Sequence, residues 1–140
     1  MQKQVLLFFF NEDEYITSYI TKIALHHWGY KIIGIASSEE DAISMLKISL
    51  PDVIIMDIVP GIILYEIKII EKIKKMNIPV IFLASYENKY IIEPAMMKDY
   101  TCGIVTKPID VNVLNSAINS ALTLPSLEGR GFFSVNHLTH

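Results

Sequence analysis

The chain alternates short apolar runs with stretches whose apolar residues recur at helical spacing. This alternation is typical of repeated βαβ units, in which helices cover both faces of a parallel sheet. The sequence therefore predicts an α/β domain with a mostly parallel sheet. The expected strands are 4–10, 31–36, 52–56, 80–84 and 103–106. The expected helices are 14–27, 37–49, 64–76, 91–98 and 111–122.

Local signals support several of these boundaries. Ser37, with Glu40 three residues later, resembles a capping box that opens the second helix. Gly29 is expected to end the first helix, and Asp110 is placed to cap the last one. The nearly unbroken apolar run 53–56 is typical of a central strand that is covered on both faces.

Composition narrows the class of protein. The 140 residues suit a single domain, and 51% hydrophobic with 19% charged residues argue against disorder. A net charge of −3 gives no support for direct nucleic-acid binding, which usually needs a concentrated basic face. The single cysteine forms no internal disulfide, and no apolar run has the length that a bilayer requires. We therefore expect a cytoplasmic protein without a membrane span.

Three of the expected strands end in residues that bind metal ions or phosphate. The first leads into Glu12 and Asp13, the third into Asp57, and the fifth into Lys107. The carboxyl ends of parallel strands lie along one edge of a sheet, where ligands bind in open α/β folds. The sequence therefore predicts that three acids and a lysine gather at that edge.

With these residues the chain resembles the receiver domain of two-component response regulators, over about residues 3–122. The resemblance implies a flavodoxin-like (βα)5 doubly wound sandwich with a five-stranded parallel sheet in the order 2-1-3-4-5. It assigns 1–122 to the receiver domain and leaves 123–140 as a tail or linker that we expect to be poorly ordered. The matching features are Glu12-Asp13, Gly29-Tyr30, Pro51-Asp52, Asp57 and Lys107-Pro108.

The resemblance also implies a phosphoacceptor site. Asp57 is the expected acceptor, because a carboxylate forms an acyl phosphate when the charge on the incoming phosphoryl group is neutralised. Mg²⁺, or Mn²⁺ in its place, prefers oxygen ligands. The implied ligands are Glu12, Asp13, Asp57 and the backbone carbonyl of Val59. Only two residues separate Asp57 from Pro60, where the family usually has three.

The remaining site positions both match the family and depart from it. Lys107 is expected to contact the phosphoryl oxygens, and the Lys107-Pro108 peptide bond to be cis, as in the family. The family's serine or threonine at the end of the fourth strand is Ala84 here, which offers only its backbone. Ser85 follows it but should point to the other face of the sheet. The family's aromatic switch position is Ile104, which is stiff and has no hydroxyl.

Our leading hypothesis is phosphorelay signalling rather than enzymatic turnover. A histidine kinase or phosphotransfer protein would donate the phosphoryl group to Asp57, and the product would alter a protein-interaction surface. Catalysis would be limited to the domain's own phosphotransfer and autodephosphorylation. In the family the face formed by helices 91–98 and 111–122 is the usual homodimer surface.

Two alternatives remain open at this point. Ala84, Ile104 and the short loop after Asp57 favour a pseudo-receiver that binds partners regardless of phosphorylation. An enzyme of flavodoxin-like fold would share the architecture, but no glycine-rich loop follows the first strand, where acids would repel an anionic cofactor. The sequence names neither the cognate kinase nor the output, and the chain is compatible with being part of a larger sensor kinase or regulator.

Overall fold

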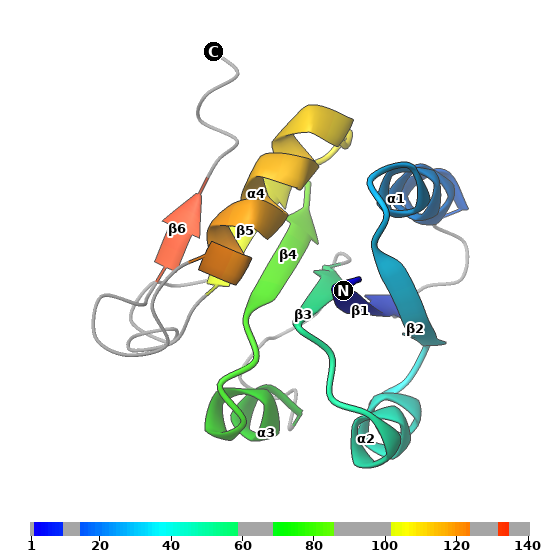
Figure 1. The fold of residues 1–140 in the computed structure, drawn as a ribbon, viewed down its shortest axis with the longest axis vertical. Coiled ribbons are helices and arrows are strands. Elements are labelled where there is room, and N and C mark those ends of the chain that lie inside the picture. The colour runs from blue at the N-terminus through cyan, green and yellow to red at the C-terminus, as the bar shows by residue number, and fades with distance from the viewer. Residues whose placement is uncertain (1, 10–14, 59–68, 86–101, 124–131, 135–140) are drawn as a thin grey trace.

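The computed structural model describes residues 2–9, 15–58, 69–85, 102–123 and 132–134 of the chain (Figure 1). The predicted helix 91–98 and the first residues of the predicted helix 64–76 lie outside these ranges. The described elements are β1 (Gln4–Phe9), α1 (Tyr15–His27), β2 (Lys31–Ala36), α2 (Glu39–Ile48), β3 (Val53–Asp57), α3 (Ile69–Lys75), β4 (Val80–Ala84), β5 (Cys102–Thr106), α4 (Val111–Thr123) and β6 (Phe132–Ser134).

The described strands form one parallel sheet in the order β2-β1-β3-β4-β5-β6. Its first five strands have the order 2-1-3-4-5, so the predicted architecture is confirmed. The sixth strand was not predicted, because the stretch 123–140 carries no clear periodicity. β6 pairs with the outer edge of β5, with Phe133 opposite Gly103. It thereby covers N–H and C=O groups that an edge strand would otherwise expose.

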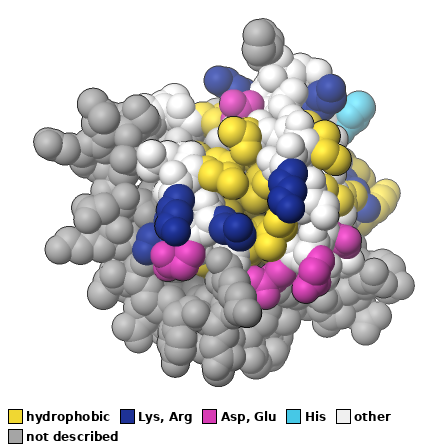
Figure 2. Space-filling model, turned by 90° about the horizontal axis from the view of Figure 1, so that it is seen from below, with side chains coloured by type: hydrophobic (Ala, Val, Ile, Leu, Met, Phe, Trp, Pro, Cys, Tyr) yellow, Lys and Arg dark blue, Asp and Glu magenta, His cyan; other side chains and the backbone are white. Residues whose placement is uncertain are grey.

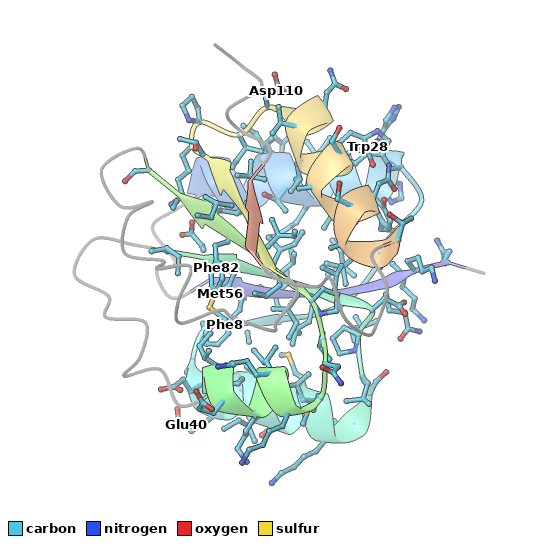
Figure 3. The ribbon with its side chains drawn as sticks, turned by 90° about the vertical axis from the view of Figure 1, so that its left-hand side faces the viewer. Phe8, Trp28, Glu40, Met56, Phe82 and Asp110 are labelled. Carbon is cyan, nitrogen blue, oxygen red and sulfur yellow. The ribbon has the colours of Figure 1, made fainter. Side chains whose placement is uncertain are left out.

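Helices cover both faces of the sheet and divide the core into two apolar clusters. One cluster lies between the sheet and α2 with α3, and the other lies between the sheet and α1 with α4. Figure 3 shows Phe8, Met56 and Phe82 on the α2 and α3 side, and Trp28 on the opposite side. β3 and β4 are buried along their whole lengths. For β3, the nearly unbroken apolar run 53–56 predicts this burial.

The face that α2 and α3 turn to solvent mixes apolar and charged side chains. Figure 2 shows apolar side chains there with lysines and acids around them. Ile48 at the end of α2 and Met76 just after α3 are exposed, and the last turn of α3 carries Lys72, Lys74 and Lys75. Charges of both signs on this face match a domain of modest net charge.

The connection from β5 through α4 to β6 has an unusual hand. It moves outward along the sheet with its helix on the α1 face. The connection from β3 through α3 to β4 moves in the same direction with its helix on the opposite face. The two connections therefore have opposite hands. Because nearly all parallel βαβ connections are right-handed, the β6 connection is the exception.

The N-terminal cap of α2 lies one residue later than predicted. Ser38 has an extended backbone, and its hydroxyl oxygen accepts a hydrogen bond from the Asp41 N–H at 3.1 Å. The predicted cap, Ser37, instead donates its hydroxyl to the Asp41 carboxylate at 3.3 Å. The prediction was wrong because either serine satisfies the sequence pattern, and the residue three positions after Ser38 is also acidic.

Other helix ends follow the local signals. Gly29 has a φ of 79°, and the Tyr30 N–H donates to the Leu25 carbonyl at 2.9 Å, so Gly29 ends α1 as predicted. Asn77 plays the same role after α3, with a φ of 58°. At the start of α4, the Asp110 carboxylate accepts hydrogen bonds from two backbone N–H groups at 2.8 and 3.2 Å, which confirms the predicted cap.

Candidate functional site

The site residues that the structure describes lie at the carboxyl edge of the sheet. Asp57 is the last residue of β3, and its Cα partners are Phe9 on β1 and Leu83 on β4. Lys107 directly follows β5. Parallel pairing of β3, β4 and β5 therefore brings Asp57 and Lys107 to the same edge, as the sequence predicts.

The carboxylate of Asp57 is fully buried and forms an ion pair. Its Oδ1 lies 2.5 Å from the Nζ of Lys107, whose side chain is 14% exposed. A buried carboxylate is costly unless a cation and hydrogen bonds offset the loss of water. The lysine therefore stabilises a charge that the apolar end of β3 would otherwise exclude.

Backbone hydrogen bonds hold the strand ends that carry this pair. The Lys107 N–H donates to the Ala84 carbonyl at 2.8 Å, and the Ile58 N–H donates to the Leu83 carbonyl at 2.8 Å. The Nζ of Lys107 also lies 3.5 Å from the Ile58 carbonyl. The Lys107-Pro108 peptide bond is cis, the geometry that the resemblance implies. These contacts fix where the lysine leaves β5 and direct its ammonium group to β3.

The other implied metal ligands lie outside the described residues. These are Glu12, Asp13 and the carbonyl of Val59. Among the described residues, no group of three His, Cys, Asp or Glu side chains could hold a metal ion. Asp57 supplies a carboxylate oxygen, a kind of ligand that Mg²⁺ prefers. β1 ends at Phe9, three residues before Glu12, and Phe9 is the Cα partner of Asp57. Asp57 is thus the one implied metal ligand among the described residues, and its carboxylate suits a magnesium ion.

The two switch positions of the family are apolar and buried. Ala84 is the fully buried last residue of β4. Ile104 on β5 is 4% exposed and packs in the cluster that faces α2 and α3. Ser85 follows β4 and is partly exposed. The pairings of β4 with both neighbours show no register shift that would turn Ser85 toward the face of Ala84.

Thr106 is a polar residue at this edge that sequence reasoning did not assign to the site. It ends β5, directly before Lys107, and is the Cα partner of Ala84. Its hydroxyl oxygen is buried and has no hydrogen-bond partner within the described part of the chain. The sequence signal was its place next to Lys107, but only the strand register puts it beside Ala84.

The sequence matches the family model of the response regulator receiver domain over residues 9–119. The chain belongs to the response regulator receiver domain family. Domains of this family are in general signalling domains rather than enzymes. No curated protein matched the sequence. In the described ranges, no helix of the receiver domain is both long and apolar enough to cross a bilayer.

Solved structures share the fold at low sequence identity. The PhyR stress response regulator matches with a TM-score of 0.65 and 20% identity over 87% of this chain and 45% of its own. The anti-anti-sigma factor PhyR from Bartonella quintana matches with a TM-score of 0.66 and 21% identity, over 87% and 48% of the two chains. The receiver domain of nitrogen regulatory protein C matches with a TM-score of 0.68 and 19% identity, over 88% and 97%. This chain spans just under half of the PhyR structures.

Proposed function

We propose that this receiver domain accepts a phosphoryl group on Asp57 from a histidine kinase or a phosphotransfer protein, in the presence of Mg²⁺. The observation that carries the proposal is the buried ion pair between Asp57 and Lys107 at the carboxyl edge of the sheet. A carboxylate held next to an ammonium group is a nucleophile whose product, an acyl phosphate, finds a cation already in place.

In the proposed transfer from phosphohistidine, Asp57 is the nucleophile and the histidine imidazole is the leaving group. A carboxylate oxygen of Asp57 forms a bond to phosphorus while the phosphorus–nitrogen bond breaks, and the imidazole leaves with the electron pair. Lys107 then faces phosphoryl oxygens as well as the carboxylate, because its Nζ is already at Asp57.

Glu12, Asp13, Asp57 and the carbonyl of Val59 would hold the magnesium ion. When bound there, the ion neutralises negative charge on the phosphoryl group. The chain's own part is to keep Asp57 away from bulk water and to orient Lys107 through the backbone bonds between β4 and β5.

The test is intact-mass analysis after incubation with acetyl phosphate and Mg²⁺. We expect the wild type to gain one phosphoryl group and Asp57→Asn to gain none. Asp52→Asn is the matched control, because Asp52 directly precedes β3, at the opposite end from Asp57, where its carboxylate accepts the Gln4 N–H at 2.7 Å. That variant should be labelled like the wild type, and removal of Mg²⁺ by a chelator should abolish labelling. An unlabelled wild type, under conditions that label another receiver domain, contradicts the proposal.

A second candidate function is a pseudo-receiver that binds its partner constitutively. The observation in its favour is that Ala84 and Ile104 are buried apolar residues where the family carries a hydroxyl and an aromatic switch. It predicts that Asp57→Asn binds the downstream partner as tightly as the wild type does. The first proposal predicts that partner affinity changes on phosphorylation in the wild type only.

The proposal includes a cytoplasmic location and an output carried by another protein or by a further domain. The two PhyR structures are described as a stress response regulator and an anti-anti-sigma factor, and each is about twice as long as the part that this chain matches. Of the surface that the family uses for dimers, α4 is described and the predicted helix 91–98 is not.

A further inference from the structure

Three large apolar side chains are exposed where α2 and α3 end. Ile48, the last residue of α2, is 85% exposed, Leu50 is 59% exposed, and Met76, directly after α3, is 43% exposed. The two helices lie side by side (Figure 1) and lead into the neighbouring parallel strands β3 and β4, so both end at the amino edge of the sheet. Leu50 and Met76 each precede one of the Cα partners Ile54 and Val80 by four residues. The three exposed side chains, which we call the apolar patch, therefore lie close together at this edge.

Lysines surround the apolar patch. Lys47 lies in the last turn of α2, and Lys72, Lys74 and Lys75 lie in the last turn of α3. Figure 2 shows apolar side chains between lysines on this face. Cations at helix C-termini complement the helix dipole, which accounts for the lysines but not for the exposed apolar side chains beside them. Apolar groups that gather on a surface inside a polar rim are typical of a protein interaction site.

The charges of the two helices are divided between their ends. The first turn of α2 carries Glu39, Glu40 and Asp41, and that of α3 carries Glu71, all toward the carboxyl edge. Within their described residues, α2 and α3 thus carry as many acids as lysines. A flat anionic surface, such as a membrane or a nucleic-acid duplex, would meet both ends at once and gain little net attraction. A short acidic chain segment contacts the lysine end alone and avoids the acids.

We propose that the apolar patch binds a short segment of another protein, in which aspartates or glutamates flank large apolar side chains. The apolar side chains of the segment cover Ile48, Leu50 and Met76, and its carboxylates pair with the surrounding lysines. The protein as a whole has a net charge of −3, so a basic end on an otherwise acidic molecule directs an acidic segment to this place. The surface is independent of the proposed phosphorylation, because it lies at the amino edge of the sheet and Asp57 lies at the carboxyl edge.

A second copy of this chain fits the patch less well. A two-fold axis makes the same surface meet itself. With the helices of the two copies antiparallel, the lysines of each copy face the acids of the other, and the apolar patch faces Glu39, Glu40 and Asp41 instead of another patch. With patch against patch, lysines face lysines. Neither arrangement satisfies both the apolar side chains and the charges, whereas an acidic segment with apolar anchors satisfies both.

The experiment measures the binding of fluorescent peptides to the full-length protein by anisotropy. The probe is a panel of synthetic peptides with leucines spaced at i, i+2 or at i, i+4 and flanked by glutamates, and matched peptides have lysine in place of glutamate. We expect an acidic peptide to bind and its lysine counterpart not to bind. Ile48→Ser/Met76→Ser should weaken binding about tenfold or more, because two buried apolar contacts are lost. Lys72→Glu/Lys75→Glu should weaken it by a similar factor and allow the lysine peptide to bind.

Tyr19→Ser/Ile23→Ser is the matched control, because it removes two exposed apolar side chains from α1 instead. This variant should bind the acidic peptide as the wild type does, and so should Asp57→Asn. The side chains that the three double variants replace are exposed, so their urea unfolding midpoints should stay close to that of the wild type.

The inference is overturned by an acidic panel that does not bind, or by patch variants that bind as tightly as the wild type. Binding to vesicles that contain phosphatidylserine, lost in Lys72→Glu/Lys75→Glu while no peptide binds, assigns the surface to a membrane instead. Dimerisation in analytical ultracentrifugation that Ile48→Ser/Met76→Ser abolishes, again without peptide binding, assigns it to a second copy. A wild type that binds the peptide but accepts no phosphate overturns the proposed function and leaves this inference intact.

Discussion

Two halves of the same sheet edge differ in chemical character. On the side of β3, a fully buried carboxylate is paired with the ammonium group of Lys107. On the side of β4 and β5, Ala84 and Ile104 are apolar and belong to the core. The first half carries the ion pair on which the proposed phosphoryl transfer rests. In the second half, Ala84 and Ile104 stand where the family has a hydroxyl and an aromatic residue. The proposed acceptance of phosphate therefore rests on the first half, and the alternative of a constitutive pseudo-receiver rests on the second.

The largest expected effect comes from breaking the charged half. Lys107→Met should lower the free energy of unfolding by about 3 kcal/mol, because it leaves the Asp57 carboxylate buried without its lysine. It should also abolish labelling by acetyl phosphate. Urea unfolding and intact mass give the two readouts.

The matched double variant Asp57→Asn/Lys107→Met removes both charges. It should recover at least half of the lost stability, because no buried charge then remains in the pair. Additive losses from the two single variants would show that the ion pair does not couple them, and the distinction between the two halves would lose its energetic basis.

A smaller loss is expected from the apolar half. Ile104→Ala removes buried methyl groups from the cluster facing α2 and α3, and should cost about 2 kcal/mol in urea unfolding. Affinity for the phosphoryl analogue beryllofluoride should change less than threefold, because the isoleucine offers no hydrogen bond to the anion. If the affinity falls with the stability, Ile104 is part of the site and the two halves are not separable.

The smallest effect is expected at the outer edge of β5. A chain that ends at Thr123 lacks β6, a three-residue strand whose connection has the unfavoured hand. We expect a change in stability of about 1 kcal/mol or less, and unchanged binding of beryllofluoride, because three edge pairs add little to a five-stranded core. This chain also tests whether 1–122 is sufficient as the receiver domain. Unfolding of the shortened chain at low urea would contradict the expectation.

The local features of the fold were predictable from the sequence to within a residue or two. Apolar runs and helical periods locate β1 to β5 and α1, and Gly29 and Asp110 mark helix ends through backbone geometry that depends only on near neighbours. The cap of α2 was misplaced because Ser37 and Ser38 are locally equivalent. β6 was missed because a three-residue strand without alternation has no periodic signal.

The sequence by itself determined the class of fold, the edge at which Asp57 and Lys107 meet, and the absence of a side-chain hydroxyl at Ala84. These follow from short-range patterns and from the geometry of parallel strands. Only the tertiary structure decided that Asp57 and Lys107 touch and that Thr106 lies in register with Ala84. The physical reason is that both relations join strands distant in sequence, and strand register depends on packing of the whole sheet rather than on any local pattern.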